Sequence, residues 1–207
     1  MVLALTKLLR TDHAQHSVTT IATNVAVRAA IVAGVVWIML RAAGQSIRDL
    51  GFERDSTGQS LVRWVLLAAG LFVAGNVVLN NIFYAVLGRG ESPPIAELFR
   101  DPHDAPFWVF SAIVGGGFAE ELWRAFVLTR FDALFGRKGL VFAVIADSLV
   151  FGLGHLYQGS ASALTTVFTG ALLALIFLWK RRVIDAMVVH ALFDLAGIAV
   201  AYALYLR

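Results

Sequence analysis

Charged residues interrupt a long apolar stretch of the sequence: Glu120, Glu121 and Arg124 lie inside residues 107–131, and Arg130 lies at the end of this range. The stretch is long enough to cross a bilayer, where each charge costs about 2.5–3.5 kcal/mol on insertion scales. On a helix, Arg124 can pair with either acid, and the two acids project about 100° apart. One can therefore face a cavity as a general base for water while Arg124 holds the other. A salt bridge that only locks helices together is the structural alternative.

A histidine on the next apolar segment lies at the same expected depth. Phe151 and His155 are four residues apart, and the sequence GRKG at 136–139 predicts a tight turn before them. Glu120 lies sixteen residues before Gly136, and His155 lies sixteen residues after Gly139. At 1.5 Å per residue, both are about 24 Å from the turn on antiparallel neighbouring helices.

The last apolar segment adds His190 and Asp194, whose spacing of four residues places them on one helix face. Asp194 can orient His190, although His190 is only about 12 Å from the basic loop at 180–182, a poorer depth match unless that loop dips into the membrane. Asp147 either supports the site or joins helices. We expect Arg28 to snorkel to the membrane interface.

The composition predicts an all-α, polytopic transmembrane helical bundle that forms a single domain over residues 1–207. Of its 207 residues, 59% are hydrophobic and only 15% are charged, whereas soluble domains average about 45–50% and 25%. The alternating pattern of a membrane barrel is absent. The chain has no cysteine, which excludes a thiolate nucleophile and Cys-ligated metals. Six segments have about the length of a spanning helix: Val25–Leu40, Leu61–Leu87, Phe107–Leu134, Leu140–His155, Ala163–Trp179 and Val183–Leu206.

The basic residues follow the expected loops rather than one face, which argues against a nucleic-acid partner despite a net charge of +3. With six spans, the loops around residues 41–63, 130–138 and 180–182 share one side and hold ten Lys and Arg residues, against five on the other side. The positive-inside rule then places these three loops in the cytoplasm and both termini outside.

Together these motifs resemble the CPBP family of intramembrane proteases, which includes the type II CAAX prenyl proteases and bacteriocin-processing relatives. The resemblance covers residues 107–197 and carries the family's motifs in order: Glu-Glu…Arg, Phe-x-x-x-His and His-x-x-x-Asn/Asp. The first motif here is Glu-Glu-x-x-Arg, one residue shorter than the family's EExxxR. Aligned on the acids, Glu120 takes the first position; aligned on Arg124, Ala119 does. Glu121 remains the competitor of Glu120 as the general base.

The resemblance implies an intramembrane endopeptidase that acts on a membrane-associated protein or peptide. Glu120, assisted by His155, would deprotonate a water molecule, and His190, positioned by Asp194, would donate to the oxyanion. Glu121 and Arg124 would form the supporting pair. No cofactor is required on this hypothesis. The alternative is a zinc ion held by Glu120, His155 and His190 with one open position, although no HExxH helix is present.

Two other function classes stay open. One is a non-catalytic immunity or scaffolding protein of the same fold, and the less favoured one is a proton-coupled transporter, because chains of Glu, His and Asp also relay protons. The small size and the lack of inverted repeats argue against transport. In each case we expect a multi-pass integral protein of the cell (inner) membrane, with the lipid bilayer as a partner.

Overall fold

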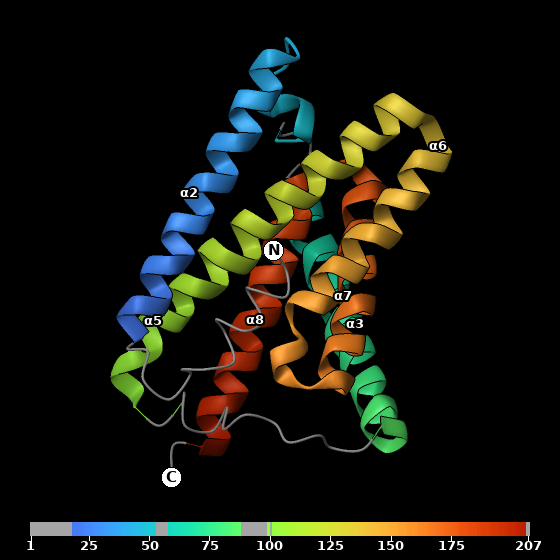
Figure 1. The fold of residues 1–207 in the computed structure, drawn as a ribbon. Helices are drawn as coiled ribbons and strands as arrows, with labels where there is room; N and C mark the ends of the chain where they lie inside the picture. Colours follow the sequence, from blue (N-terminus) through green and yellow to red (C-terminus); the bar gives the residue numbers. More distant parts are fainter. Residues whose placement is uncertain (1–17, 53–57, 88–98, 100, 206–207) are drawn as a thin grey trace.

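The computed structural model describes residues 18–52, 58–87, 99 and 101–205, and this part of the chain contains helices and no strand (Figure 1). The all-α prediction is confirmed. Basic residues of the charge comparison such as Lys7, Arg10, Arg54 and Arg89 lie outside the described residues. The five α-helices of more than twenty residues are α2 (Val18–Ala42), α3 (Gly58–Leu87), α6 (Glu121–Gly154), α7 (Ser160–Lys180) and α8 (Val183–Tyr205).

One continuous helical rod carries the acidic pair into the bundle. It starts with the short helix α5 (Ala105–Phe110), continues as the π-helix η3 (Ser111–Glu120) and passes into α6 at Glu121. Within α6 the chain reverses at Gly136, whose backbone angles of φ 60° and ψ −155° are accessible only to glycine. The predicted turn between the third and fourth apolar segments is therefore confirmed.

The helices pack around the two arms of α6. The second arm packs against α7, α7 also contacts α3, and α8 lies against η3 with α2 on the other side of η3 (Figure 1). The main apolar core lies where α6, α7 and α8 meet, with Leu128, Phe177 and Val183 at most 1% exposed. A second core joins α2 to the first arm of α6 through Val36, Leu40 and Leu122 and includes Leu50 from the short helix η1 (Ile47–Leu50).

Within the part of the chain that the structure describes, four helices are long and apolar enough to cross a membrane by length and composition: 18–42, 68–87, 160–180 and 183–204. Many large apolar side chains on these helices point outward, including Trp37 at 59% and Trp179 at 73% exposure. Such outward apolar faces suit contact with lipid. The chain is therefore a multi-pass integral membrane protein. The remaining two predicted spans, 107–134 and 140–155, are helical but hold the buried charges of the site, and their crossing stays a prediction.

Candidate active site

Three consecutive glycines in η3 let two other helices approach the acidic pair. A Cβ added at Gly116 would overlap Asp194 Oδ2, and one at Gly117 would lie 2.9 Å from Ala191 Cβ and 3.0 Å from the Met187 carbonyl oxygen. α8 can therefore lie directly against the η3 backbone. On another side, a Cβ at Gly115 would lie 3.2 Å from Val25 Cγ1 of α2. Small residues let membrane helices approach closely, so a run of three glycines by itself predicts a closely packed neighbour beside the acids, and these contacts agree with it.

Glu121 and Arg124 form a buried ion pair, each 1% exposed as a residue. The Arg124 Nη1 group donates to Glu121 Oε1, and Nε donates to Asp147 Oδ2 at 2.8 Å. Because Asp147 lies on the second arm of α6, Arg124 joins the two arms at this depth. Its guanidinium also lies over the Phe151 ring, 4.9 Å from the centroid. Asp147 thus has both roles considered for it, because it supports Arg124 and joins the two arms.

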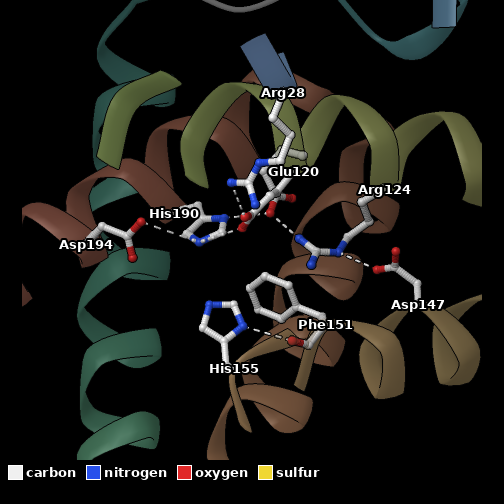
Figure 2. Close-up of polar contacts among 9 residues, drawn as sticks. Arg28, Glu120, Arg124, Asp147, Phe151, His155, His190 and Asp194 are labelled. Atoms are coloured by element: carbon white, nitrogen blue, oxygen red, sulfur yellow. Dashed lines mark hydrogen bonds and ion pairs between the residues drawn. The ribbon is translucent and has the colours of Figure 1, made fainter. Parts of the chain in front are cut away.

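His190 is buried beside both glutamates. Its Nδ1 lies 2.8 Å from Glu121 Oε1, and its Nε2 lies 4.0 Å from Glu120 Oε2 and 3.7 Å from Asp194 Oδ2 (Figure 2). A carboxylate only accepts, so Nδ1 carries the proton of that hydrogen bond. Glu121 rather than Asp194 therefore orients the imidazole, and Nε2 is turned toward Glu120 and Asp194.

The depth of His190 is explained by the position of the connection between α7 and α8. Arg181 in this connection donates to Asp132 Oδ2 at 2.8 Å, and Asp132 precedes the Gly136 reversal by one turn. The α7–α8 connection thus lies beside Asp132, about one turn deeper in the bundle than the Gly136 reversal. A helix that starts there needs fewer residues to reach the glutamates, so the short spacing to His190 is compatible with the site.

Glu120 is 23% exposed and pairs with an arginine from outside the predicted set. Arg28 Nη2 on α2 donates to Glu120 Oε1 at 2.9 Å (Figure 2). We expected Arg28 to snorkel to the interface, and the structure places it at the site instead. The sequence held no signal for this contact, because a single arginine near the start of an apolar segment has many possible partners.

His155 lies on the other side of Phe151 from Glu120 (Figure 2). Its Nδ1 donates to the Phe151 carbonyl oxygen at 2.8 Å, because a carbonyl oxygen only accepts. The Phe151 ring lies edge-on to His155 and to His190, with centroids 4.8 and 5.8 Å apart. Phe151 therefore lies at the centre of the cluster and separates Glu120 from His155.

Two cavities meet at Phe151. One, of about 340 Å³, is lined by His155, His190 and Asp194 together with polar side chains of α3 and α7; the other, of about 400 Å³, is lined by Arg28, Glu120 and apolar side chains of α2 and α6. The polar wall is built by contacts between helices, in which Thr169 donates to Asn76 and Thr165 donates to Asn80 at 3.3 Å. Asn76 and Asn80 therefore form hydrogen bonds between α3 and α7.

The residues considered for zinc do not form a ligand set in this geometry. Among the described residues, no group of three His, Cys, Asp or Glu side chains converges closely enough to hold a metal ion. Glu120 faces one cavity and His155 the other, with the Phe151 ring between them (Figure 2). Glu120 lines one cavity, His155, His190 and Asp194 line the other, and Phe151 lines both.

Comparison with known proteins matches residues 102–196 to the family model "Type II CAAX prenyl endopeptidase Rce1-like". A search of curated proteins and a search of solved structures each found no match. The matched segment contains η3, both arms of α6, α7 and most of α8, and with them all six site residues expected from the sequence: Glu120, Glu121, Arg124, His155, His190 and Asp194. It does not contain α2 or Arg28. Residues 102–196 of this chain thus match the Rce1-like domain of the type II CAAX prenyl endopeptidases.

Proposed function

We propose that the chain is an intramembrane endopeptidase that hydrolyses a peptide bond of a membrane-associated protein or peptide with an activated water molecule. The observation that carries this proposal is the meeting of Glu120, Glu121 and His190 beside cavities inside the bundle. Buried acids and imidazoles in an apolar bundle are costly and serve chemistry when they converge on a cavity. The family match supports peptide-bond hydrolysis as that chemistry.

Glu120 is the residue we assign as the general base. It is the more exposed of the two acids, and its Oε2 is turned toward His190. A water molecule at this carboxylate would give its proton to Glu120 while its oxygen attacks the scissile carbonyl carbon. The proton then passes to the leaving amine as the C–N bond breaks, so the carboxylate is regenerated.

The two histidines divide the remaining work. His190, with Nδ1–H held by Glu121, would stabilise the oxyanion by donating from Nε2 when that nitrogen is also protonated. His155 lines the cavity on the other side of the Phe151 ring, so we assign its assistance to Glu120 to a state of the enzyme in which that ring has moved aside. Asp194 borders the same cavity and interacts with His190 Nε2 at 3.7 Å.

We further propose that the chain works in the cell membrane with six crossings, so that both arms of α6 span it. The two arms pack between helices that are themselves long enough to span, α7 for the second arm and α2 and α8 for the first. Buried pairing of Glu121, Arg124 and Asp147 lowers the cost of their charges at that depth.

The test compares new protein termini by mass spectrometry in cells that carry the wild type or Glu120→Gln at equal expression. Termini specific to the wild type would identify a protease and its substrates, and purified components would then show direct cleavage. Asp101→Asn, which changes an exposed carboxylate that contacts His103 outside the cluster, is the matched control and should behave as the wild type. Identical termini from wild type and Glu120→Gln would favour a non-catalytic immunity or scaffolding protein.

Purified enzyme should stay active after metal stripping, and a requirement for added zinc would contradict the water-only mechanism.

A further inference from the structure

An arginine outside the family-matched residues completes the surroundings of Glu120. Arg28 lies on α2, and its guanidinium donates to Glu120 Oε1 at 2.9 Å, while the other oxygen of the same carboxylate lies 4.0 Å from His190 Nε2. The carboxylate is thus held from two sides by two different helices. With only one oxygen bound to Arg28, the rotation of the carboxylate is defined and Oε2 is directed at the imidazole.

The packing of α2 against η3 delivers this arginine. A Cβ at Gly115 would lie 3.4 Å from Arg28 Nη2 and 3.2 Å from Val25 Cγ1, so it would touch the guanidinium and require the Val25 side chain to shift by a few tenths of an ångström. Val25 and Arg28 are one turn apart on the same face of α2. The first glycine of the run therefore serves the contact between Arg28 and Glu120, as the next two serve the approach of α8.

The surroundings of the Arg28–Glu120 pair indicate that it orients the carboxylate more than it stabilises the fold. Arg28 is 55% exposed and Glu120 is 23% exposed, and ion pairs at such exposure contribute little to stability. Around them, Ile31, Val32 and Val35 of α2 form an apolar cavity wall. A hydrogen bond beside apolar walls fixes geometry more firmly than one in bulk water.

We propose that Arg28 is a positioning residue of the active site, which holds Glu120 so that Oε2 stays beside His190. This inference rests on the proposed function. It also makes α2 part of the working enzyme, because residues 102–196 alone lack this contact. Displacement of a reacting group by about 1 Å can lower a rate by about 10²-fold, so loss of Arg28 should act mainly on kcat.

The experiment measures kcat and KM of the purified full chain for Arg28→Gln, Arg28→Lys and Gly115→Ala, with Arg41→Gln as the control. Arg41 is an exposed arginine on the same helix, whose guanidinium lies over Trp37 at 6.0 Å. We expect Arg28→Gln to lose about 10²-fold in kcat with little change in KM, because Glu120 would no longer be held beside His190. Arg28→Lys should recover part of the loss, Gly115→Ala should lose less than Arg28→Gln, and Arg41→Gln should match the wild type.

A second readout does not depend on turnover. We expect a water-soluble carbodiimide to label Glu120 faster in Arg28→Gln than in the wild type or Arg41→Gln, because the guanidinium no longer covers one carboxylate oxygen. Unchanged labelling overturns the inference, as does faster labelling with an unchanged kcat. If the wild type cleaves nothing, the proposed function fails, while the labelling still decides whether Arg28 holds Glu120. If wild type and Arg28→Gln cleave equally and Glu120→Gln is inactive, only the role of Arg28 is lost.

Discussion

At the scale of single residues, two adjacent glutamates occupy opposite environments. Glu121 is 1% exposed and its Oε1 accepts from both Arg124 and His190, whereas Glu120 is 23% exposed and faces a cavity. The difference follows from the angle between neighbouring positions on a helix, which turns one side chain inward and the other toward α2. Glu121 is thereby committed to holding other groups, and Glu120 keeps one oxygen for chemistry.

This division predicts that two isosteric changes lower the free energy of unfolding by different amounts. Glu121→Gln should lower the free energy of unfolding by about 3 kcal/mol, the lower end of the cost of breaking a buried ion pair, because Arg124 keeps Asp147. Glu120→Gln should cost less than about 1 kcal/mol, because its arginine partner is half exposed. Unfolding of both purified variants in detergent measures the difference. Equal stabilities would contradict the separation of a supporting and a working acid.

The sequence predicted the chemical groups of the site better than their partners. Spacing on one helix places Glu121 near Arg124 and His190 near Asp194, and the first of these pairs is a direct ion pair. The contacts from Glu121 to His190 and from Arg28 to Glu120 join residues 69 and 92 positions apart. Such contacts depend on which helices are neighbours, and periodicity within a helix does not contain that information.

At the scale of elements, the first arm of α6 depends on its continuation from η3. A π-helix is rare and occurs mostly near functional sites, and here it spans the ten residues that end at Glu120. Because its three glycines have no side chains, groups of α8 and side chains of α2 can lie directly against its backbone. The sequence indicated close packing at these glycines, but it gave no sign of the π-helical geometry, which has no period of its own in an apolar stretch.

A contact between two connections fixes the start of α8. Gly51, at the end of η1, has φ 83°, and a Cβ there would overlap the Arg181 carbonyl oxygen and lie 3.0 Å from Arg182 Cα. The preceding residue, Leu50, is 0% exposed in the core shared by α2 and α6. The connection after α2 therefore supports the connection before α8, and with it the depth at which His190 meets the glutamates.

Gly51→Ala should consequently destabilise the protein more than Gly44→Ala. Both positions have positive φ, but a Cβ at Gly44 would have no atom within 4 Å. The left-handed conformation costs about 1–2 kcal/mol in both variants. The clash at Gly51 should add about 1–3 kcal/mol, as overpacking does in protein cores. Thermal unfolding in detergent measures both, and equal losses would show that the contact with Arg181 contributes little.

At the scale of the whole molecule, the hydropathy of single helices and their packing in the bundle give different numbers of membrane crossings. Among the described residues, hydropathy alone selects four helices, and the two arms of α6, which contain Glu121, Arg124 and Asp147, are not among them. These charges pair with one another inside the bundle, so the hydropathy of the sequence underestimates how well each arm suits the membrane. In Figure 1 the connection after α2 and the reversal within α6 lie at one end, and the far ends of α3 and α8 lie at the other.

The number and direction of crossings can be separated with three single-cysteine variants, since the chain has no native cysteine. His103→Cys, Lys138→Cys and Ser160→Cys place exposed thiols before the first arm of α6, beside its reversal and at the start of α7. With six crossings and basic loops in the cytoplasm, an impermeant maleimide should label positions 103 and 160 in intact cells and position 138 only after permeabilisation. Labelling of position 138 alone would keep six crossings and reverse the orientation. If all three behave alike, neither arm of α6 crosses, and the glutamates would lie in a re-entrant pair of helices that is tolerated only because protein surrounds it.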